Sequence, residues 1–481
     1  MTPILATVHP AFVLRARRWE GVLRSDVAKA LRHARGELRW RDPEIVLDPT
    51  IGQLDGALEA LGAKKLAAVD TETDGLDPER VNLRCVGLCD GDFGVAVGFR
   101  SCVSPWGEGQ YVEREGGSPR PLRCPPEAAR ERLRNFFAGC RCRLALHNQV
   151  YDQPVLRRHG MPLPDVTRIV DTIMLHRSAD SEMPHDLDFL ASMRTDAPKW
   201  KGHDHAAWSS DAALHEYCVR DVAVTARIAP GLRDEVVRGG QQGVYAGDLE
   251  LQRLAIGMHR AGVVVDRDEQ ARHAGRLREA MGVAAARAEG AAPGACPNLA
   301  SADQVSAYLF LSRDGLRLHS TEVYTPQGDP SVNKDAVYEL LRRDLPLQTR
   351  AFLDALLDYR RAQKALTAFV DNLVADPETG RVHATWNPHS TAVGRLSCSG
   401  PNLQTIPDTK IDTDSLRSMF VAAPGCVLVG ADYDQLHMRI VAARAPVAAW
   451  LETFDRMARG ETGPSADIHK VSAALFYSKQ P

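Results

Sequence analysis

Two acidic residues near the start of the chain have the type and spacing needed to hold a divalent cation. Asp70 and Glu72 follow a short apolar run, residues 66–69. Side chains at positions i and i+2 of a strand share one face, so these carboxylates are expected side by side. Adjacent carboxylates repel each other unless a cation neutralises them. Alone this is a weak indication of a metal site, because acidic residues often end strands.

Two pairs of polar residues follow at helical spacing. Asn148 and Asp152 are four residues apart, and so are Tyr217 and Asp221. Residues at i and i+4 lie on one face of a helix. Each pair alone is better explained as the exposed face of an amphipathic helix. All of these residues together, in this order and spacing, are much harder to explain in that way.

In this order and spacing the sequence resembles the DEDD exonucleases, in the version with a tyrosine. The resemblance implies a site with two divalent cations, Mg²⁺ or Mn²⁺, in which Tyr217 orients the attacking water. The implied metal ligands are Asp70, Glu72, Asp152 and Asp221. Two metals about 4 Å apart can activate a water and stabilise the leaving oxygen of an in-line displacement. Carboxylates supply the hard oxygen ligands that these cations prefer.

Two further side chains are DNA contacts on the same resemblance. Asn148 is expected to contact the DNA, and Leu76 matches an apolar wedge that packs against the terminal base. For Leu76, packing in the protein core is an equally good interpretation. The expected reaction is 3′→5′ degradation of single-stranded DNA from its 3′ end.

Two later segments resemble the polymerase domain of the family A DNA polymerases. They are residues 390–407 and 427–439. In the first, Arg395, Asn402 and Gln404 match residues that reach the minor groove of the primer–template. The acceptors of that groove are nearly the same for all base pairs, as a polymerase that copies every sequence requires. In the second, an apolar strand is expected to end at Asp432, which matches the aspartate that holds two catalytic metals.

The segment that follows Asp432 contains three residues that are expected to lie beside the incoming dNTP: Tyr433, Gln435 and His437. His437 stands where the family usually has a glutamate that helps to exclude the ribose 2′-OH, so sugar selection is in doubt. In the alternative interpretation, His437 simply hydrogen-bonds a neighbouring tyrosine as the glutamate would.

Hydrophobic patterning indicates the elements that must position these residues. Residues 50–230 alternate apolar strands with helical patterns, residues from about 245 to 372 are helical, and short strands follow. We therefore expect an α/β RNase H-like exonuclease domain, followed by a mostly helical thumb and a partial α+β polymerase palm. The expected domains are an N-terminal segment (residues 1–48), the exonuclease (49–232) and the partial polymerase (233–481). Within the partial polymerase, the thumb is expected at about 245–372 and the partial palm at about 373–481.

The sequence contains neither the fingers helix with its nucleotide-binding Lys and Tyr nor a later His-Asp-Glu turn. We therefore expect a second chain that carries the fingers and the His-Asp-Glu turn, motif C. The expected function is replication or repair synthesis with proofreading by a split or truncated polymerase. A stand-alone exonuclease with a DNA-clamping C-terminal region is one alternative. A non-catalytic fragment that binds primer–template is another, although the exonuclease carboxylates argue against it. The compressed architecture is compatible with a phage origin.

The N-terminal segment has two features of its own. Residues 5–15 are similar to the last catalytic segment of uracil-DNA glycosylases, with His9 as a relic, although a chance strand–turn–helix competes with this interpretation. Residues 11–41 contain nine Lys or Arg against three Asp or Glu, which fits either a nucleic-acid patch or a solvated helix.

Composition bounds the remaining possibilities. The chain has 481 residues, 44% of them hydrophobic and 25% charged, as in soluble globular proteins. A net charge of −3 produces no global field toward DNA. No apolar run approaches the roughly 18 residues of a membrane helix, and no signal peptide is visible, so we expect a cytoplasmic protein. The ten cysteines show neither zinc-finger nor disulfide spacing and are expected to be reduced.

Overall fold

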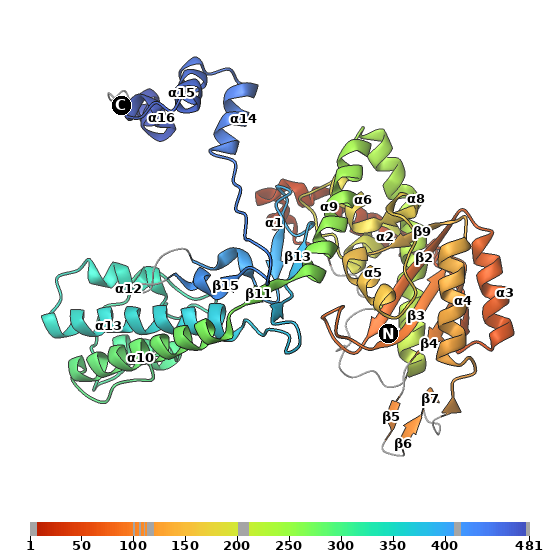
Figure 1. Ribbon diagram of the computed structural model, residues 1–481, viewed down its shortest axis with the longest axis horizontal. Helices are drawn as coiled ribbons and strands as arrows, with labels where there is room; N and C mark the ends of the chain where they lie inside the picture. Colours follow the sequence, from red (N-terminus) through yellow and green to blue (C-terminus); the bar gives the residue numbers. More distant parts are fainter. Residues whose placement is uncertain are drawn as a thin grey trace. The chain divides into compact units, whose positions relative to one another are not determined.

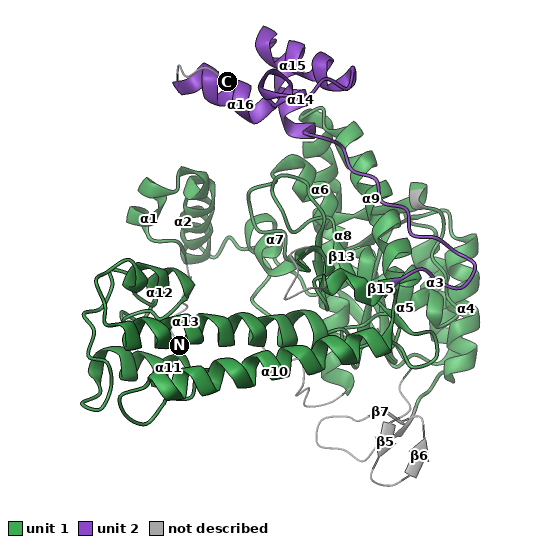
Figure 2. Ribbon diagram, turned by 60° about the vertical axis from the view of Figure 1, so that its left-hand side comes forward, with its two compact units in different colours: residues 1–420 green, residues 421–481 purple. Residues whose placement is uncertain are grey.

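The computed structural model describes residues 7–99, 102–104, 107–109, 111–112, 120–200, 211–407 and 415–477. The chain forms two compact units, Met1–Phe420 and Val421–Pro481 (Figure 2). Among the described residues, no helix is long and apolar enough to cross a membrane.

A six-stranded mixed sheet forms the centre of the N-terminal half of the first unit (Figure 1). Its strands, in spatial order, are β1 (Glu44–Leu47), β4 (Phe93–Gly98), β3 (Leu83–Cys89), β2 (Leu66–Thr73), β9 (Arg143–Leu146) and β10 (Ile169–Asp171). Strand β3 is antiparallel to β2 and β4, whereas β9 is parallel to both β2 and β10, and β1 is parallel to β4. The central position of β2 places its C-terminal end in the middle of the sheet edge.

Helices cover both faces of this sheet, and the alternation of β2 decides which residues face which layer. Ala67 and Val69 belong to the core on the side of α3 (Ile51–Gly62) and α4 (Pro126–Gly139). Ala68 belongs to the opposite core. That second core contains α8 (Asp211–Arg238), with residues of α6 (Thr172–Ala179) and α7 (Leu187–Arg194). Because the period of a strand is two, Asp70 and Glu72 share the face of Ala68 and point toward α8.

Three short helices before β1 pack against this second layer. They are α1 (Pro10–Arg15), η1 (Arg17–Trp19) and α2 (Glu20–Ala34). The ring of Trp19 lies 6.3 Å from that of Phe189 on α7, centroid to centroid. His9 caps α1, since its Nδ1 accepts a hydrogen bond from the Ala11 N–H at 3.1 Å. The helix expected after His9 is therefore present, whereas residues 5 and 6 of the glycosylase-like segment lie outside the described residues.

The second half of the first unit is mostly helical, as expected from the sequence. Helix α9 (Gln242–Ala261) leads through β11 (Val263–Val265) to α10 (Arg267–Ala291). Helices α10 and α13 (Leu347–Lys364) lie side by side (Figures 1 and 2). They are antiparallel, because Arg287 pairs with Asp358 at 2.8 Å while Arg278 pairs with Asp371, just after α13, at 3.4 Å. Smaller elements complete this part: α11 (Ala302–Ser306), η3 (Ala307–Leu311), α12 (Lys334–Leu341) and η4 (Ala365–Asp371).

Short strands follow the helical part. Strand β12 (Arg381–Val382) is antiparallel to β11, and β13 (Thr385–Asn387) forms a hairpin with β14 (Ser397–Ser399). The chain then passes through η5 (Leu403–Thr405), η6 (Leu416–Met419) and β15 (Phe420–Val421), where the second unit begins.

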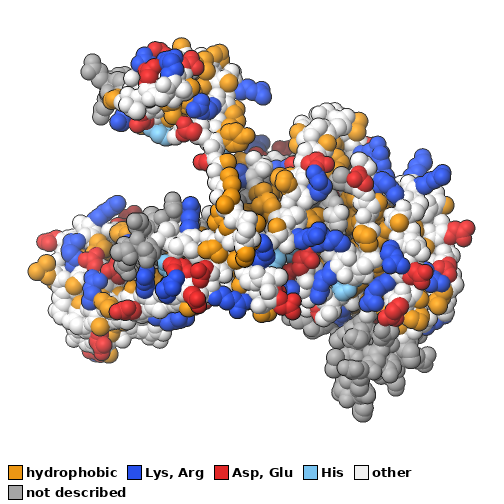
Figure 3. Space-filling view, viewed as in Figure 1, with side chains coloured by type: hydrophobic (Ala, Val, Ile, Leu, Met, Phe, Trp, Pro, Cys, Tyr) orange, Lys and Arg blue, Asp and Glu red, His pale blue; other side chains and the backbone are white. Residues whose placement is uncertain are grey.

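Besides the short helix η7 (Pro464–Ala466), the described residues of the second unit form three α-helices and a small core. They are α14 (Leu436–Arg444), α15 (Ala448–Ala458) and α16 (Ile468–Tyr477), and their core is built on Trp450 and Phe454. The strand expected to end at Asp432 is not formed, so that expectation was wrong. Val427 and Val429 are 81% and 85% exposed. Exposed hydrophobic side chains lie along this segment (Figure 3). A β-strand needs a neighbouring strand for its backbone hydrogen bonds, and the described residues offer none here.

Candidate functional site

The end of β2 and the middle of α8 form the one cluster of potential metal ligands among the described residues. A carboxylate oxygen of Asp70, a carboxylate oxygen of Glu72 and the sulfur of Cys218 all lie within 4.8 Å of one another. Asp70 and Glu72 are half-buried, while Cys218 on α8 is fully buried. The two carboxylates that the sequence pairs on one strand face are thus close enough to share a cation.

Cys218 is the sulfur donor of this cluster and suits Mg²⁺ less well than the two carboxylates do. Its hydrogen bond with Cys85, together with burial, holds the pKa of the Cys218 thiol well above its ordinary value. A protonated thiol is a poor ligand, and sulfur in any case suits softer metals than Mg²⁺. The charged donors of the cluster are therefore carboxylate oxygens, and this donor set fits a hard divalent cation.

Asp152 reaches the same end of β2 from α5 (Gln149–Arg158). Asn148, the residue before this helix, adopts a left-handed conformation with φ of 83°, and this turns the chain from β9 into α5. One Asp152 oxygen accepts hydrogen bonds from the Thr71 N–H at 3.1 Å and the Thr71 hydroxyl at 2.6 Å. Burial raises the pKa of Asp152 to about 7. Its hydrogen bonds to Thr71 place Asp152 beside Asp70 and Glu72, but Asp152 is not a member of the 4.8 Å cluster.

Asp221 and Tyr217 lie one turn apart on α8, and both are buried. The indole N–H of Trp200 donates a hydrogen bond of 2.6 Å to Asp221 Oδ1. Asp221 is likewise not a member of the 4.8 Å cluster. Of the four carboxylates expected from the sequence, the structure brings two together and ties the other two to neighbouring donors.

Three buried polar residues behind the site escaped the sequence analysis. Asp171, at the end of β10, is fully buried and accepts hydrogen bonds from the Gln149 N–H at 2.8 Å and the Gln252 amide at 3.0 Å. The Gln149 amide in turn donates to Gln252 at 2.6 Å. Since Gln252 belongs to α9, this network joins α5 to the second half of the unit. Asp171 follows an apolar strand, which is the same sequence signal that singled out Asp70.

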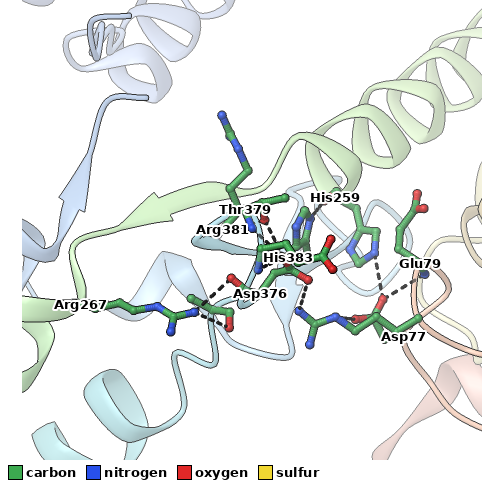
Figure 4. Close-up of polar contacts among 11 residues, drawn as sticks. Asp77, Glu79, His259, Arg267, Asp376, Thr379, Arg381 and His383 are labelled. Atoms are coloured by element: carbon green, nitrogen blue, oxygen red, sulfur yellow. Dashed lines mark hydrogen bonds and ion pairs between the residues drawn. The ribbon is translucent and has the colours of Figure 1, made fainter. Parts of the chain in front are cut away.

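The loop after β2 contains Leu76, whose side chain is 91% exposed. This excludes the core-packing interpretation of Leu76 and leaves it available for contact with DNA. Next to it, Asp77 lies 3.5 Å from Nε2 of His259 on α9 (Figure 4). Arg80 pairs with Asp376, before β12, at 3.4 Å. The loop is thus attached at two points to the second half of the unit.

The expected minor-groove residues lie around the β13–β14 hairpin, and all three are exposed. The Asn402 side chain accepts a hydrogen bond from the Gln404 N–H at 3.1 Å, and the Gln404 amide donates to the Leu396 carbonyl at 3.0 Å. The Thr391 hydroxyl donates to the Arg395 carbonyl at 2.7 Å and braces the turn. These bonds fix the backbone of a polar surface segment.

The residues expected around the polymerase metals lie in the second unit. Asp432 is exposed and belongs to no cluster of three or more metal-ligating side chains in the described part of the chain. Tyr433 is 78% exposed. Gln435 has a positive φ of 53° before α14 and lies 3.3 Å from Nε2 of His469. His437 is on the first turn of α14. The expected polymerase metal site is therefore not assembled around Asp432 in the part of the chain that the structure describes.

Comparison with known proteins gives two family matches in this chain. Residues 49–237 match the model of the 3′-5′ exonuclease, and residues 268–481 match that of DNA polymerase family A. DNA polymerase I of Synechocystis sp. is 28% identical over 454 residues, which cover 91% of this chain and 42% of that protein. DNA polymerase I of Rhizobium leguminosarum is 26% identical over 94% of this chain and 44% of its own length. The chain thus spans less than half the length of these curated relatives.

A solved structure shows the same fold. The POL domain of Pol1 from M. smegmatis, in complex with DNA primer-template and dNTP, superposes with a TM-score of 0.64 at 22% identity, over 91% of this chain and 68% of that one. Together with the exonuclease match, this likeness confirms the expected fold class, an α/β exonuclease domain followed by a mostly helical region. An exonuclease match and a polymerase match, in this order along one chain, support a DNA polymerase of family A.

Proposed function

We propose that this chain acts in DNA replication or repair as a family A DNA polymerase with 3′→5′ proofreading. Its substrates would be primer–template DNA, dNTPs and single-stranded 3′ ends. The proposed domains are an N-terminal segment (residues 1–48), the exonuclease (49–232) and a partial polymerase domain (233–481) with the thumb and part of the palm. The order of the two family matches supports this assignment. The second chain and the phage origin expected from the sequence stay predictions.

The exonuclease assignment rests on one observation above all, the closeness of Asp70 and Glu72 at the end of β2. With Asp152 and Asp221 they would hold two divalent cations, Mg²⁺ or Mn²⁺, which supply an activated water and stabilise the leaving oxygen. Tyr217, one turn from Asp221, would orient the attacking water. The exposed Leu76 would pack against the terminal base, and Asn148 would contact the DNA strand.

In the polymerase region, the exposed segment with Arg395, Asn402 and Gln404 would follow the minor groove of the primer–template. Its fixed backbone and polar side chains suit acceptors that are common to all base pairs. Asp432 would hold the catalytic cations. Tyr433, Gln435 and His437 would line the dNTP site.

A second candidate function, 3′→5′ exonuclease activity without DNA synthesis, is favoured by the state of the two sites. The carboxylates of β2 belong to a cluster of potential metal ligands, whereas Asp432 belongs to no such cluster among the described residues. The two candidates differ in primer extension. Primer extension is measured with this chain alone and together with a second chain that carries the fingers and motif C. Mg²⁺-dependent extension that is lost in the D432A variant supports the polymerase, and degradation without extension under both conditions supports the exonuclease alone.

The exonuclease proposal is tested by degradation of 5′-labelled single-stranded DNA with Mg²⁺. Replacement of Asp70 and Glu72 by alanine should abolish activity, because loss of two ligands destroys the two-metal geometry. The E127A variant is the control, since this carboxylate is exposed on α4. Unchanged degradation by the double variant would refute the site.

A further inference from the structure

Asp221 is held by a residue that is not part of any motif identified in the sequence. Trp200 is only 9% exposed and packs in the core between the sheet and α8. Its indole N–H donates to Asp221 Oδ1 at 2.6 Å. Tryptophan has one side-chain donor and no acceptor, so the polarity of this bond is fixed. The bond orients the carboxylate and occupies one of its oxygens.

The segment before Trp200 is in turn fixed by the N-terminal helices. Arg32 of α2 forms a two-pronged contact with Asp196, with nitrogen–oxygen distances of 2.8 and 2.9 Å. The Arg39 N–H donates to the same carboxylate at 3.0 Å, and the Lys29 ammonium group donates to the Thr195 carbonyl at 3.0 Å. Two-pronged arginine–carboxylate contacts are geometrically specific as well as strong. Helix α2 thus holds the backbone four residues before Trp200.

The ionisation of Asp196 agrees with its contact to Arg32. Burial raises the pKa of Asp196, but the hydrogen bonds from Arg39 and Arg32 outweigh this and keep the pKa below its ordinary value. Asp196 is therefore ionised at neutral pH. These N-terminal helices lie before residue 49, where the match to the exonuclease family begins. The support for Trp200 comes from outside the matched domain.

We propose that Trp200 is a positioning residue for Asp221, and that α2 stabilises the segment that bears it. This inference rests on the proposed exonuclease function. The indole holds Asp221 Oδ1 so that the second oxygen is presented to a cation in a fixed orientation. Hydrogen bonds to ligating carboxylates set ligand orientation in metal sites, and their loss typically lowers metal affinity or activity about 10- to 100-fold. The N-terminal segment thereby contributes to the exonuclease site through Trp200.

The test compares W200F with W450F. Phenylalanine keeps an aromatic ring but lacks the N–H. Trp450 is a matched control, because it is 8% exposed and its indole nitrogen has no hydrogen-bond partner among the described residues. Mn²⁺ affinity is measured by electron paramagnetic resonance, beside the Mg²⁺ dependence of single-stranded DNA degradation and the thermal unfolding temperature.

W200F should bind Mn²⁺ about 10-fold or more weakly and need correspondingly more Mg²⁺, while W450F binds and degrades like the wild type. A role in packing alone would lower the unfolding temperature of W200F and leave its Mn²⁺ affinity unchanged, which would overturn the proposal. If the wild type itself degrades no DNA, the proposed function fails instead, so the two failures are distinguishable.

The contribution of α2 is tested separately with R32Q, which removes the two-pronged contact to Asp196 and leaves Trp200 intact. We expect a smaller loss of Mn²⁺ affinity in the same direction as W200F. Unchanged affinity in R32Q would overturn the role of α2.

Discussion

The buried carboxyl of Asp152 should make the stability of this protein depend on pH in a way that one substitution removes. Burial raises the pKa of Asp152 from 3.8 to about 7. The folded chain therefore holds this proton more tightly than the unfolded chain, and stability falls as the pH rises from about 4 to 7. One pKa unit corresponds to about 1.4 kcal/mol, so the full effect is on the order of 4 kcal/mol.

The D152N variant keeps the side-chain volume and has no proton to lose. Its stability relative to the wild type should rise by about 2 kcal/mol between pH 5.5 and 7.5, the accessible part of that range. The assay is urea unfolding of both proteins in EDTA at several pH values. The same change at the exposed Asp335 corrects for the substitution itself. Mg²⁺ should then stabilise the wild type more than D152N, because a ligand stabilises the state that binds it.

A difference between D152N and the wild type that does not change with pH would refute this reasoning. It would mean that Asp152 ionises in the folded chain at the pH of an ordinary aspartate, so that its burial has no electrostatic consequence. An equal response of both proteins to Mg²⁺ would remove Asp152 from the set of proposed metal ligands.

Three further predictions concern single side chains. Y217F should slow DNA degradation about 10-fold or more while Mn²⁺ affinity is kept, because the tyrosine acts on the attacking water; equal loss of both would refute this role. Burial lowers the pKa of His259, but the contact with Asp77 outweighs it and raises this pKa above 6.5. The ion pair therefore stabilises the fold below pH 6.5, and this contribution is lost as the pH rises through the raised pKa. The unfolding temperature of H259Q should thus fall further below that of the wild type at pH 5.5 than at pH 8.5, and a constant gap would contradict the ion pair. In primer extension, H437E should discriminate more strongly against ribonucleotides, and equal discrimination would show that another residue forms the wall beside the sugar.

Local spacing was enough to predict the parts of the site that belong to one element. The period of two in β2 predicts that Asp70 and Glu72 share a face, and they lie within 4.8 Å. The period of a helix predicts that Tyr217 and Asp221 lie one turn apart on α8. The alternation of apolar and helical patterns likewise predicted the α/β fold, because one sheet between two helical layers buries both patterns.

Contacts between distant segments could not be predicted in this way. Trp200 and Asp221 are 21 positions apart, and Gln149 and Gln252 are 103 apart, with no periodicity to link them. The strand expected before Asp432 failed for a related reason. Apolar composition favours a strand at residues 427–431, but pairing requires a neighbour that local sequence does not specify.

The central claim, a carboxylate site for divalent cations between β2 and α8, is tested most directly by a crystal structure with Mn²⁺ and a single-stranded oligonucleotide. Anomalous scattering would locate the cations without reference to activity. We expect Mn²⁺ bound by Asp70, with Glu72 and Asp221 among its ligands and the 3′ end of the DNA beside it. Well-ordered DNA together with Mn²⁺ bound only elsewhere, and none within ligand distance of Asp70, would contradict the account.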